Sequence, residues 1–139
     1  CARLGERGLF LAPEPERMEP SDTTFASFGF TPFGSLLPHC RAIVHHGGIG
    51  TTSRALREGL PQVVIPHSHD QPDNALRVRA LGAGDFVPSD GLDADRLVRA
   101  LGPQLDGAGN RRAGRDAGST NGPDAAAAAI TRLVRASRA

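Results

Sequence analysis

Residues 44–52 read Val-His-His-Gly-Gly-Ile-Gly-Thr-Thr, and this stretch decides the fold that the sequence predicts. The apolar run 42–44 is typical of a buried strand, while the glycines and hydroxyl residues after it are typical of a turn that opens a helix. Gly59 suits a helix end, because glycine adopts the left-handed conformation there, and Pro61 follows it. Residues 62–65, in which Gln62 precedes the apolar Val63, Val64 and Ile65, then predict a second buried strand, parallel to the first.

The flanking sequence continues this alternation of strands and helices. Residues 8–12 predict a strand. After the crossover, residues 71–81 show helical spacing and end at Gly82, and a short strand is expected around residues 86–87. Apolar residues at helical spacing predict a further helix over 93–101. We therefore expect an α/β fold with a Rossmann-like parallel sheet flanked by helices.

The chain is predicted to divide into three parts. Residues 1–101 form the Rossmann-like domain. Residues 102–123 are rich in Gly, Asn, Ser and Arg and predict a loop or linker. Asp124 can cap a last helix, which the sequence places over 124–139.

The turn after the first strand combines residue types that suit an anion: His46, Gly47, Gly48, Gly50, Thr51 and Thr52. The glycines allow positive φ and a close approach of phosphate oxygens. The threonines stand where N-cap hydroxyls belong, and the helix dipole adds about half a positive charge there. The histidine can donate a hydrogen bond at the mouth of the turn. These features predict a site for a nucleotide-sugar diphosphate, although a glycine-rich turn alone would also fit a purely structural role.

A second polar segment, Asp70-Gln71-Pro72-Asp73-Asn74, follows the second strand. Ligands of open α/β sheets bind outside the carboxyl ends of the strands. Both polar segments follow such ends, so we expect them to face one crevice.

Together these motifs resemble the C-terminal, donor-binding half of GT-B glycosyltransferases. The similarity is greatest to the UDP-glycosyltransferase-like family, which includes bacterial enzymes acting on lipids, sterols and natural products. It extends from about residue 28 to about residue 84. The motifs that carry it are Phe30-Thr31-Pro32-Phe33, Leu36-Leu37-Pro38, the His-His-Gly-Gly turn, Gly59-Leu60-Pro61, and Asp70-Gln71 with Asn74.

The resemblance implies a role for each matched residue. His46 and the glycines and threonines of the turn correspond to donor-diphosphate ligands, and Asp70 and Gln71 correspond to the pair that binds sugar hydroxyls. Nucleobase and ribose contacts are implied for Phe30, Thr31 and Arg54. Phe30 replaces a tryptophan common in relatives, and Arg54 and Phe33 replace a glutamate and a glutamine of plant-type members. The choice between a UDP-sugar and a TDP-sugar therefore stays open.

The resemblance also implies the reaction, an inverting transfer of a hexose to an acceptor hydroxyl. In this family the acceptor pocket and the catalytic base belong to an N-terminal domain. A chain of 139 residues that begins at Cys1 fits one domain, so we expect part of a longer protein, with no catalytic residue and no activity by itself. That N-terminal domain is its expected partner. Oligomeric state is not predicted.

Two other functions fit the sequence. A GT-B-fold UDP-sugar epimerase also binds a nucleotide sugar between two domains, although the His-His-Gly-Gly turn fits it less well. A non-catalytic nucleotide-sugar-binding module would need the same cradle without any transfer.

A metal site is a further alternative, with His45, His46, His67, His69 and Asp70 as ligands. Neighbouring residues on a strand point to opposite faces, which separates His45 from His46. We therefore expect no metal or other cofactor, with His45 hydrogen-bonded below the turn and His67 and His69 beside the sugar.

Composition narrows the class of protein. The net charge is +1, all sixteen basic residues are arginine, and aromatic residues make up 4%, so a nucleic-acid-binding surface is not expected. The two cysteines do not make a disulfide framework. No apolar run approaches the roughly 18 residues of a membrane-spanning helix. We predict a cytoplasmic protein, whose membrane association, if any, comes from the absent domain or from a lipid acceptor.

Overall fold

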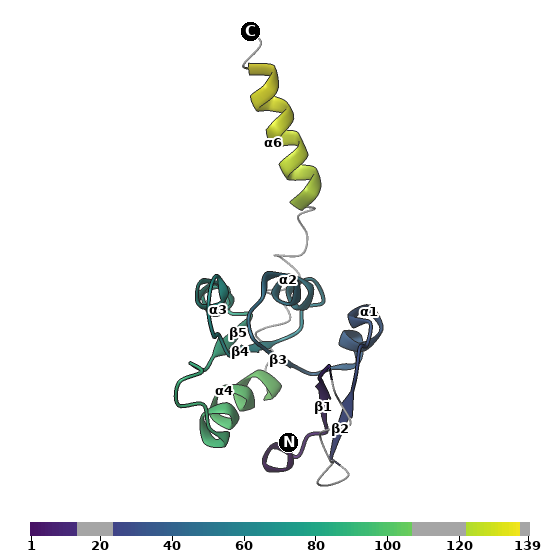
Figure 1. Cartoon of the computed structure of the whole chain (residues 1–139), viewed down its shortest axis with the longest axis vertical. Helices are drawn as coiled ribbons and strands as arrows, with labels where there is room; N and C mark the ends of the chain where they lie inside the picture. The colour runs from purple at the N-terminus through teal and green to yellow at the C-terminus, as the bar shows by residue number, and fades with distance from the viewer. Residues whose placement is uncertain (14–23, 107–121, 137–139) are drawn as a thin grey trace.

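The computed structural model describes residues 1–13, 24–106 and 122–136 (Figure 1). Strands and helices alternate from residue 43 to residue 106, as the sequence predicts, whereas the strand at residues 25–28 and the short helices at residues 33–39 were not predicted. In chain order the elements are η1 (Ala2–Leu4), β1 (Gly8–Leu11), β2 (Phe25–Phe28), α1 (Phe33–Leu36), η3 (Leu37–His39), β3 (Ile43–His45), α2 (Ile49–Arg57), β4 (Gln62–Val64), α3 (Gln71–Ala80), β5 (Gly84–Phe86), α4 (Ala94–Asp106) and α6 (Gly122–Ala136).

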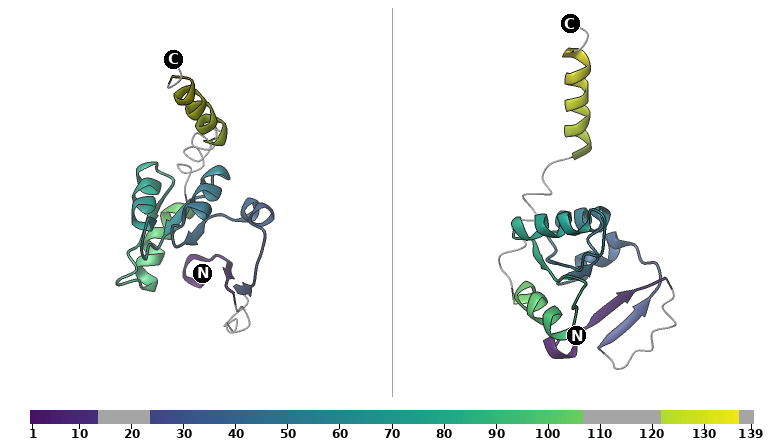
Figure 2. Two further views of the ribbon diagram at one scale, coloured as in Figure 1. Left: turned by 45° about the horizontal axis from the view of Figure 1, so that its top comes forward. Right: turned by 60° about the vertical axis from the view of Figure 1, so that its left-hand side comes forward.

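The strands form two parallel sheets. β1 pairs with β2, and β4 lies between β3 and β5 in the second sheet. The predicted α/β class with parallel strands and flanking helices is confirmed, but the described strands do not join into one sheet (Figure 2). Arg41, just before β3, links the parts: its guanidinium contacts Glu6, just before β1, and donates to the carbonyl oxygen of Leu105 in α4 at 2.8 Å.

Helices cover both faces of the sheet β3–β5. Val63 and Val64 are neighbours in β4 and both are fully buried, but they belong to different clusters. Val64 packs with residues of α3, and Val63 packs with Ala100 of α4. Successive strand residues point to opposite faces, so β4 needs apolar side chains at consecutive positions. This explains the two consecutive valines of β4, which follow the buried Gln62.

Glycine ends the two central helices where the sequence predicts. Gly59 follows α2 with φ of 63°, and Gly82 follows α3 with φ of 64°. Both values lie in the left-handed region, which costs little at glycine. The chain can therefore reverse directly into β4 and β5.

Two predicted boundaries in the C-terminal region were wrong. α4 continues to Asp106, through the first part of the predicted linker 102–123 and past Pro103. Pro103 is exposed, the neighbouring Leu101 and Leu105 are partly buried, and Arg41 binds the Leu105 carbonyl near the helix end. The remainder of that linker up to residue 121 lies outside the described residues.

The last helix, α6, begins at Gly122, before the predicted cap Asp124, and the described part ends at Ala136. It stands apart from the sheets and their helices in Figures 1 and 2. Its apolar side chains are largely exposed, with Ile130 at 61%. Among the described helices, none combines the length and apolar character that crossing a bilayer requires.

Candidate functional site at the carboxyl ends of β3 and β4

The two predicted site segments lie side by side. The turn after β3 leads into α2, and the loop after β4 leads into α3. Asn74 of α3 donates to the carbonyl oxygen of Gly47 at 2.9 Å, and a Cβ atom on Gly47 would lie 3.3 Å from the carbonyl oxygen of Gln71. The expected shared location of the two segments is therefore observed.

Gly47 takes a conformation that requires glycine. Its φ is 90°, and an added Cβ atom would lie 2.6 Å from Cγ1 of Val64. Its N–H group donates to Nδ1 of His45 at 3.1 Å, and its carbonyl accepts from Asn74. Hydrogen bonds on both sides and the packing against β4 thus fix this peptide, and with it the path of the turn.

Gly48 and Gly50 do not take the positive φ that the sequence analysis expects for the glycines of the turn. Gly48 has φ of −60° and is the N-cap of α2, and a Cβ atom there would lie 2.5 Å from Nε2 of His46. Gly50 is inside the helix, and apart from its chain neighbours and the backbone of the same helix, no described atom lies within 4 Å of its Cβ position. Gly48 therefore makes room for the imidazole, and Gly50 leaves the surface of the first helical turn open.

α2 begins at Ile49, two positions before the predicted start. The first bond inside the helix runs from the N–H group of Thr52 to the carbonyl of Gly48 at 3.0 Å. The hydroxyl of Thr52 donates to the same carbonyl at 3.1 Å, so Thr52 is not the expected N-cap. The N–H groups of Ile49, Gly50 and Thr51 precede that bond and have no partner within the helix. These three donors and the positive end of the helix dipole form an anion-binding geometry.

His45 supports the turn from below, as predicted. Its Nδ1 accepts from Gly47, so Nε2 carries the proton and donates to Oε1 of Gln62 at 2.9 Å. Burial lowers the pKa of His45 from its ordinary 6.5, the bond to Gln62 opposes this, and the nearby His46 lowers the pKa further. The neutral imidazole is therefore favoured, which keeps Nδ1 available as an acceptor. Nε2 of Gln62 is buried without a hydrogen-bond partner among the described residues.

His46 has the opposite orientation and is exposed. Its ring is nearly perpendicular to that of His45, with the centroids 6.5 Å apart. The two side chains point in different directions because successive residues at the end of a strand face opposite sides. His46 is thus free to meet a ligand above the turn, while His45 is part of its support.

The loop before α3 is shaped by Gln71. Its Oε1 accepts from the N–H groups of His67 at 2.8 Å and Ser68 at 3.2 Å. His69 has φ of 60°, unusual for a residue other than glycine, and its Nδ1 lies 2.7 Å from the Ser68 hydroxyl. The oxygen of Gln71 is therefore committed inside the loop, so that only its amide nitrogen remains for the predicted sugar contact.

Asn74 is a site residue whose role the sequence motifs do not predict. It belongs to the Asp-Gln-x-x-Asn pattern, but the pattern by itself predicts no role for it. It bonds Gly47 and also donates to Oδ2 of Asp70 at 2.9 Å. The spacing of four residues from Asp70 at a helix start could have indicated their contact. The contact with Gly47 could not be read from spacing.

The residues predicted for the nucleobase and ribose lie beside α1. Phe30 is 96% exposed, and Thr31 is partly buried. Arg54 pairs with Glu58 at 3.1 Å and packs against α1, where a Cβ atom on Gly34 would lie 3.0 Å from its Nη2. Its Nε is buried with no partner in the described part of the chain. Their roles toward a nucleotide stay predictions.

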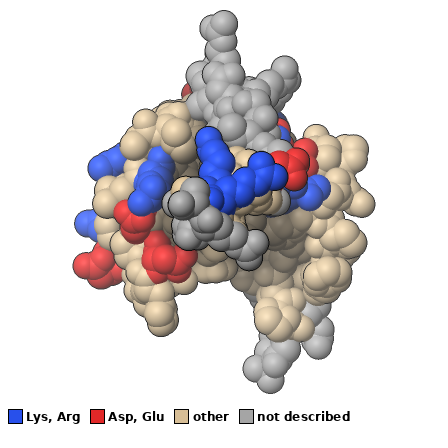
Figure 3. Space-filling model, turned by 90° about the horizontal axis from the view of Figure 1, so that it is seen from above, with Lys and Arg blue, Asp and Glu red and all other residues tan. Residues whose placement is uncertain are grey.

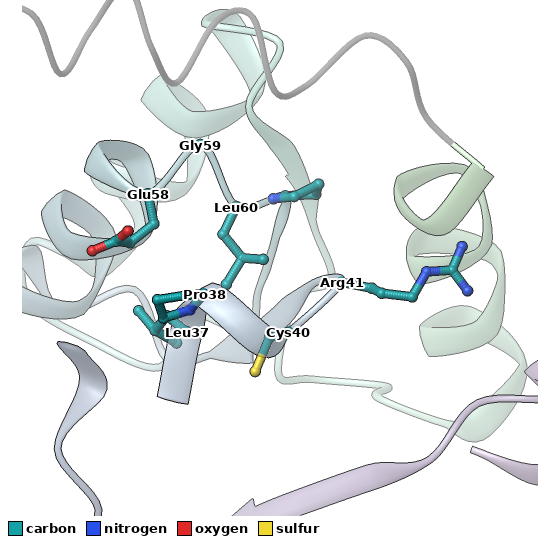
Figure 4. A pocket seen from close by; sticks show the side chains of 8 residues that line it. Leu37, Pro38, Cys40, Arg41, Glu58, Gly59 and Leu60 are labelled. Carbon is teal, nitrogen blue, oxygen red and sulfur yellow. The ribbon is translucent and has the colours of Figure 1, made fainter. Parts of the chain in front are cut away.

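A cavity of about 150 Å³ lies at the other end of the sheet (Figure 4). Its lining comes from the segments before β3 and β4, including Cys40, Leu60 and Pro61. Arg41 points away from it toward α4, and burial raises the pKa of the Cys40 thiol. The amino ends of the strands are far from His46 along β3, so this cavity is separate from the candidate site.

Known proteins with similar sequences or structures point to one family. A profile described as "Erythromycin biosynthesis protein CIII-like, C-terminal domain" matches residues 20–133. The chain is 44% identical over 72 residues to erythronolide mycarosyltransferase of Saccharopolyspora erythraea, covering 52% of the chain and 17% of that protein. It is 41% identical over 102 residues to O-mycaminosyltylonolide 6-deoxyallosyltransferase of Streptomyces fradiae, covering 73% of the chain and 24% of that protein.

The solved structures agree with this grouping. The glycosyltransferase VinC, crystallised in complex with DTDP, matches 81% of this chain and 29% of its own, with a TM-score of 0.72 and 29% identity. The chain spans about a quarter or less of the length of the two curated relatives. The predicted resemblance is thus confirmed: this chain belongs to the erythromycin biosynthesis protein CIII-like C-terminal domain family of GT-B glycosyltransferases.

Proposed function

We propose that this chain forms the nucleotide-sugar-binding part of an inverting glycosyltransferase that moves a hexose from a nucleoside diphosphate to an acceptor hydroxyl. The observation that carries the proposal is the turn at Gly47. Its fixed geometry presents the free N–H groups of residues 49–51 next to His46 and beside the Asp70 loop. A diphosphate and its attached sugar would meet these two segments together.

The turn supplies stabilisation suited to a leaving diphosphate. During transfer, the acceptor oxygen bonds to the anomeric carbon while the bond from that carbon to the diphosphate breaks. The diphosphate leaves with the electron pair, and negative charge grows on its oxygens. Backbone donors at a helix N-terminus and the His46 imidazole would stabilise that charge. The base that takes the acceptor proton is proposed to lie in an N-terminal domain.

Charge elsewhere on this side of the molecule is largely balanced. Arg54 pairs with Glu58, and Arg77 pairs with Asp73 at 2.7 Å. Figure 3 shows basic side chains next to acidic ones on the side where α2 and α3 lie in Figure 1. Binding of an anion in our proposal therefore depends on local donors and not on a broad basic surface.

The proposal is tested by calorimetric titration of the chain with UDP and dTDP and with their glucose conjugates. His46→Ala should weaken binding about tenfold to hundredfold, because it removes a donor to a charged oxygen. His39→Ala is the matched control, since His39 is exposed and lies before β3. Equal affinity of wild type and His46→Ala, or no binding by the wild type, would contradict the proposal.

A longer chain that includes an acceptor-binding domain would separate transfer from the two other functions. Nucleoside diphosphate released only when an acceptor hydroxyl is present supports the transferase. Conversion of the sugar without acceptor would indicate an epimerase, and saturable binding without release would indicate a binding module. The cytoplasmic location stays a prediction.

A further inference from the structure

Asn74 joins the two halves of the candidate site through one buried amide group. Its Nδ2 atom donates to the carbonyl oxygen of Gly47 and to Oδ2 of Asp70, both at 2.9 Å. The residue is 7% exposed, whereas Asp70 is exposed. We propose that Asn74 is a positioning residue that couples the diphosphate turn to the sugar loop, an inference that rests on the function proposed above.

The chemistry of a primary amide suits this place. Both partners are acceptors, one a peptide carbonyl and the other a carboxylate, and an uncharged amide nitrogen has two N–H donors for them. Rotation of the amide by half a turn would set its oxygen against both acceptors. The surrounding groups therefore fix the orientation of Asn74. A backbone bond from the Asn74 N–H group to the Asp70 carbonyl at 3.0 Å belongs to the same helical turn.

The bond to Gly47 acts on the whole turn. His45 accepts from the N–H group of Gly47, and Asn74 donates to its carbonyl, so both polar groups of this residue are held. The direction of these peptides sets where the N–H groups of residues 49–51 point. On the other side, Asn74 occupies Oδ2 of Asp70, which leaves Oδ1 for a sugar hydroxyl. The spacing between the diphosphate donors and the sugar acceptor thus depends on Asn74.

The decisive variant is Asp70→Ala, with UDP or dTDP as the probe, whichever the wild type binds more tightly. Neither probe carries a sugar. Loss of one acceptor should loosen Asn74 and the turn, and should weaken binding of the nucleoside diphosphate about threefold to tenfold, the value of one hydrogen bond. Removal of a nearby negative charge alone would instead tighten binding of an anion. The direction of the change therefore separates coupling from electrostatics.

Asp73→Ala is the control, because Asp73 lies on the same helix, is exposed and forms an ion pair with Arg77. Asn74→Asp, which keeps the size of the side chain, should weaken binding more strongly than Asp70→Ala. A purely structural role would lower the unfolding temperature of Asn74→Asp and leave the affinity of its folded form unchanged. Should Asn74→Asp fail to fold, the exposed Asp70→Ala variant still decides the question.

Amide hydrogen exchange of Gly47 without ligand gives a second readout. Asp70→Ala should accelerate this exchange relative to Asp73→Ala, because the hydrogen bonds that link Asp70 to Gly47 run through Asn74. Unchanged exchange, together with unchanged or tighter nucleotide binding, would overturn the coupling. If the wild type binds neither nucleotide, the proposed function fails, and the exchange rates alone support or overturn the role of Asn74 in holding the turn.

Discussion

His45 accepts a hydrogen bond from the N–H group of Gly47, with 3.1 Å between the two nitrogen atoms. The two residues are separated by one position, so the last residue of β3 directly shapes the turn that follows it. The other ring nitrogen donates to Gln62 of β4, which ties the turn to the centre of the sheet. The imidazole therefore links β4 to the turn that leads into α2 through two hydrogen bonds.

Loss of this support should destabilise the fold. His45→Leu leaves the Gly47 donor and Oε1 of Gln62 without their partner, and unsatisfied buried groups cost about 1–3 kcal/mol. His45→Asn places an amide oxygen near the position that Nδ1 occupies in the wild type, so it should lose less stability than His45→Leu. Urea unfolding of the three proteins measures these differences. A wild-type midpoint for His45→Leu would show that the bond contributes nothing.

The same histidine should make stability depend on pH. Burial lowers the pKa of His45 in the folded protein below 6.5, so the unfolded chain binds the proton more readily. The stability that neutral His45 contributes is therefore complete above pH 6.5, and it declines as the pH falls from 6.5 through the lower pKa of the folded protein. Urea unfolding between about pH 8 and about pH 5 should show this loss in the wild type and a smaller one in His45→Asn. His39→Asn, at an exposed site, should keep the wild-type slope.

Two glycines of the turn should respond oppositely to alanine. Gly47→Ala combines φ of 90° with a Cβ atom 2.6 Å from Val64, and should destabilise the protein by at least about 1–3 kcal/mol. Gly50→Ala meets open space inside a helix and should stabilise it by about 0.5–1 kcal/mol.

Ligand binding gives a second test of Gly50→Ala. The methyl group of Gly50→Ala would stand on the surface where we propose that phosphate oxygens approach. Calorimetry should therefore show weaker UDP binding by a variant whose thermal stability is equal to or above that of the wild type. An unchanged affinity of Gly50→Ala for UDP would show that the phosphates do not bind against the first turn of α2.

Phe30 should affect nucleotide affinity without affecting stability. At 96% exposure its ring makes little contact with the described part of the chain, so Phe30→Ala should unfold within about 0.5 kcal/mol of the wild type. If the ring stacks on a nucleobase, the variant should bind UDP or dTDP with lower affinity, because stacking is worth about 1–3 kcal/mol per base. Equal affinity of Phe30→Ala and the wild type would remove Phe30 from the site.

The strands and helices from β3 to α4, and the glycine ends of α2 and α3, were predictable because they depend on neighbouring residues, whereas β2 and α1 were not predicted. Consecutive apolar residues identified β4, helical spacing identified α3, and the preference of glycine for positive φ identified the ends at Gly59 and Gly82. The start of α2 was less predictable. Both Thr51 and Gly48 are reasonable N-terminal residues by type, and the start follows from the backbone bond between the Thr52 N–H group and the Gly48 carbonyl.

By itself the sequence determined the α/β class, the order of the elements from β3 to α4 and the two polar segments at strand ends, since local conformational preferences and side-chain periodicity depend on neighbouring residues. Only the tertiary structure decided that the described strands form two sheets and that Arg54 lies against α1. It also brought Asn74 to Gly47, 27 positions away. Such contacts depend on how the helices pack on the sheet and on which buried polar groups must find partners, and no local pattern records that outcome.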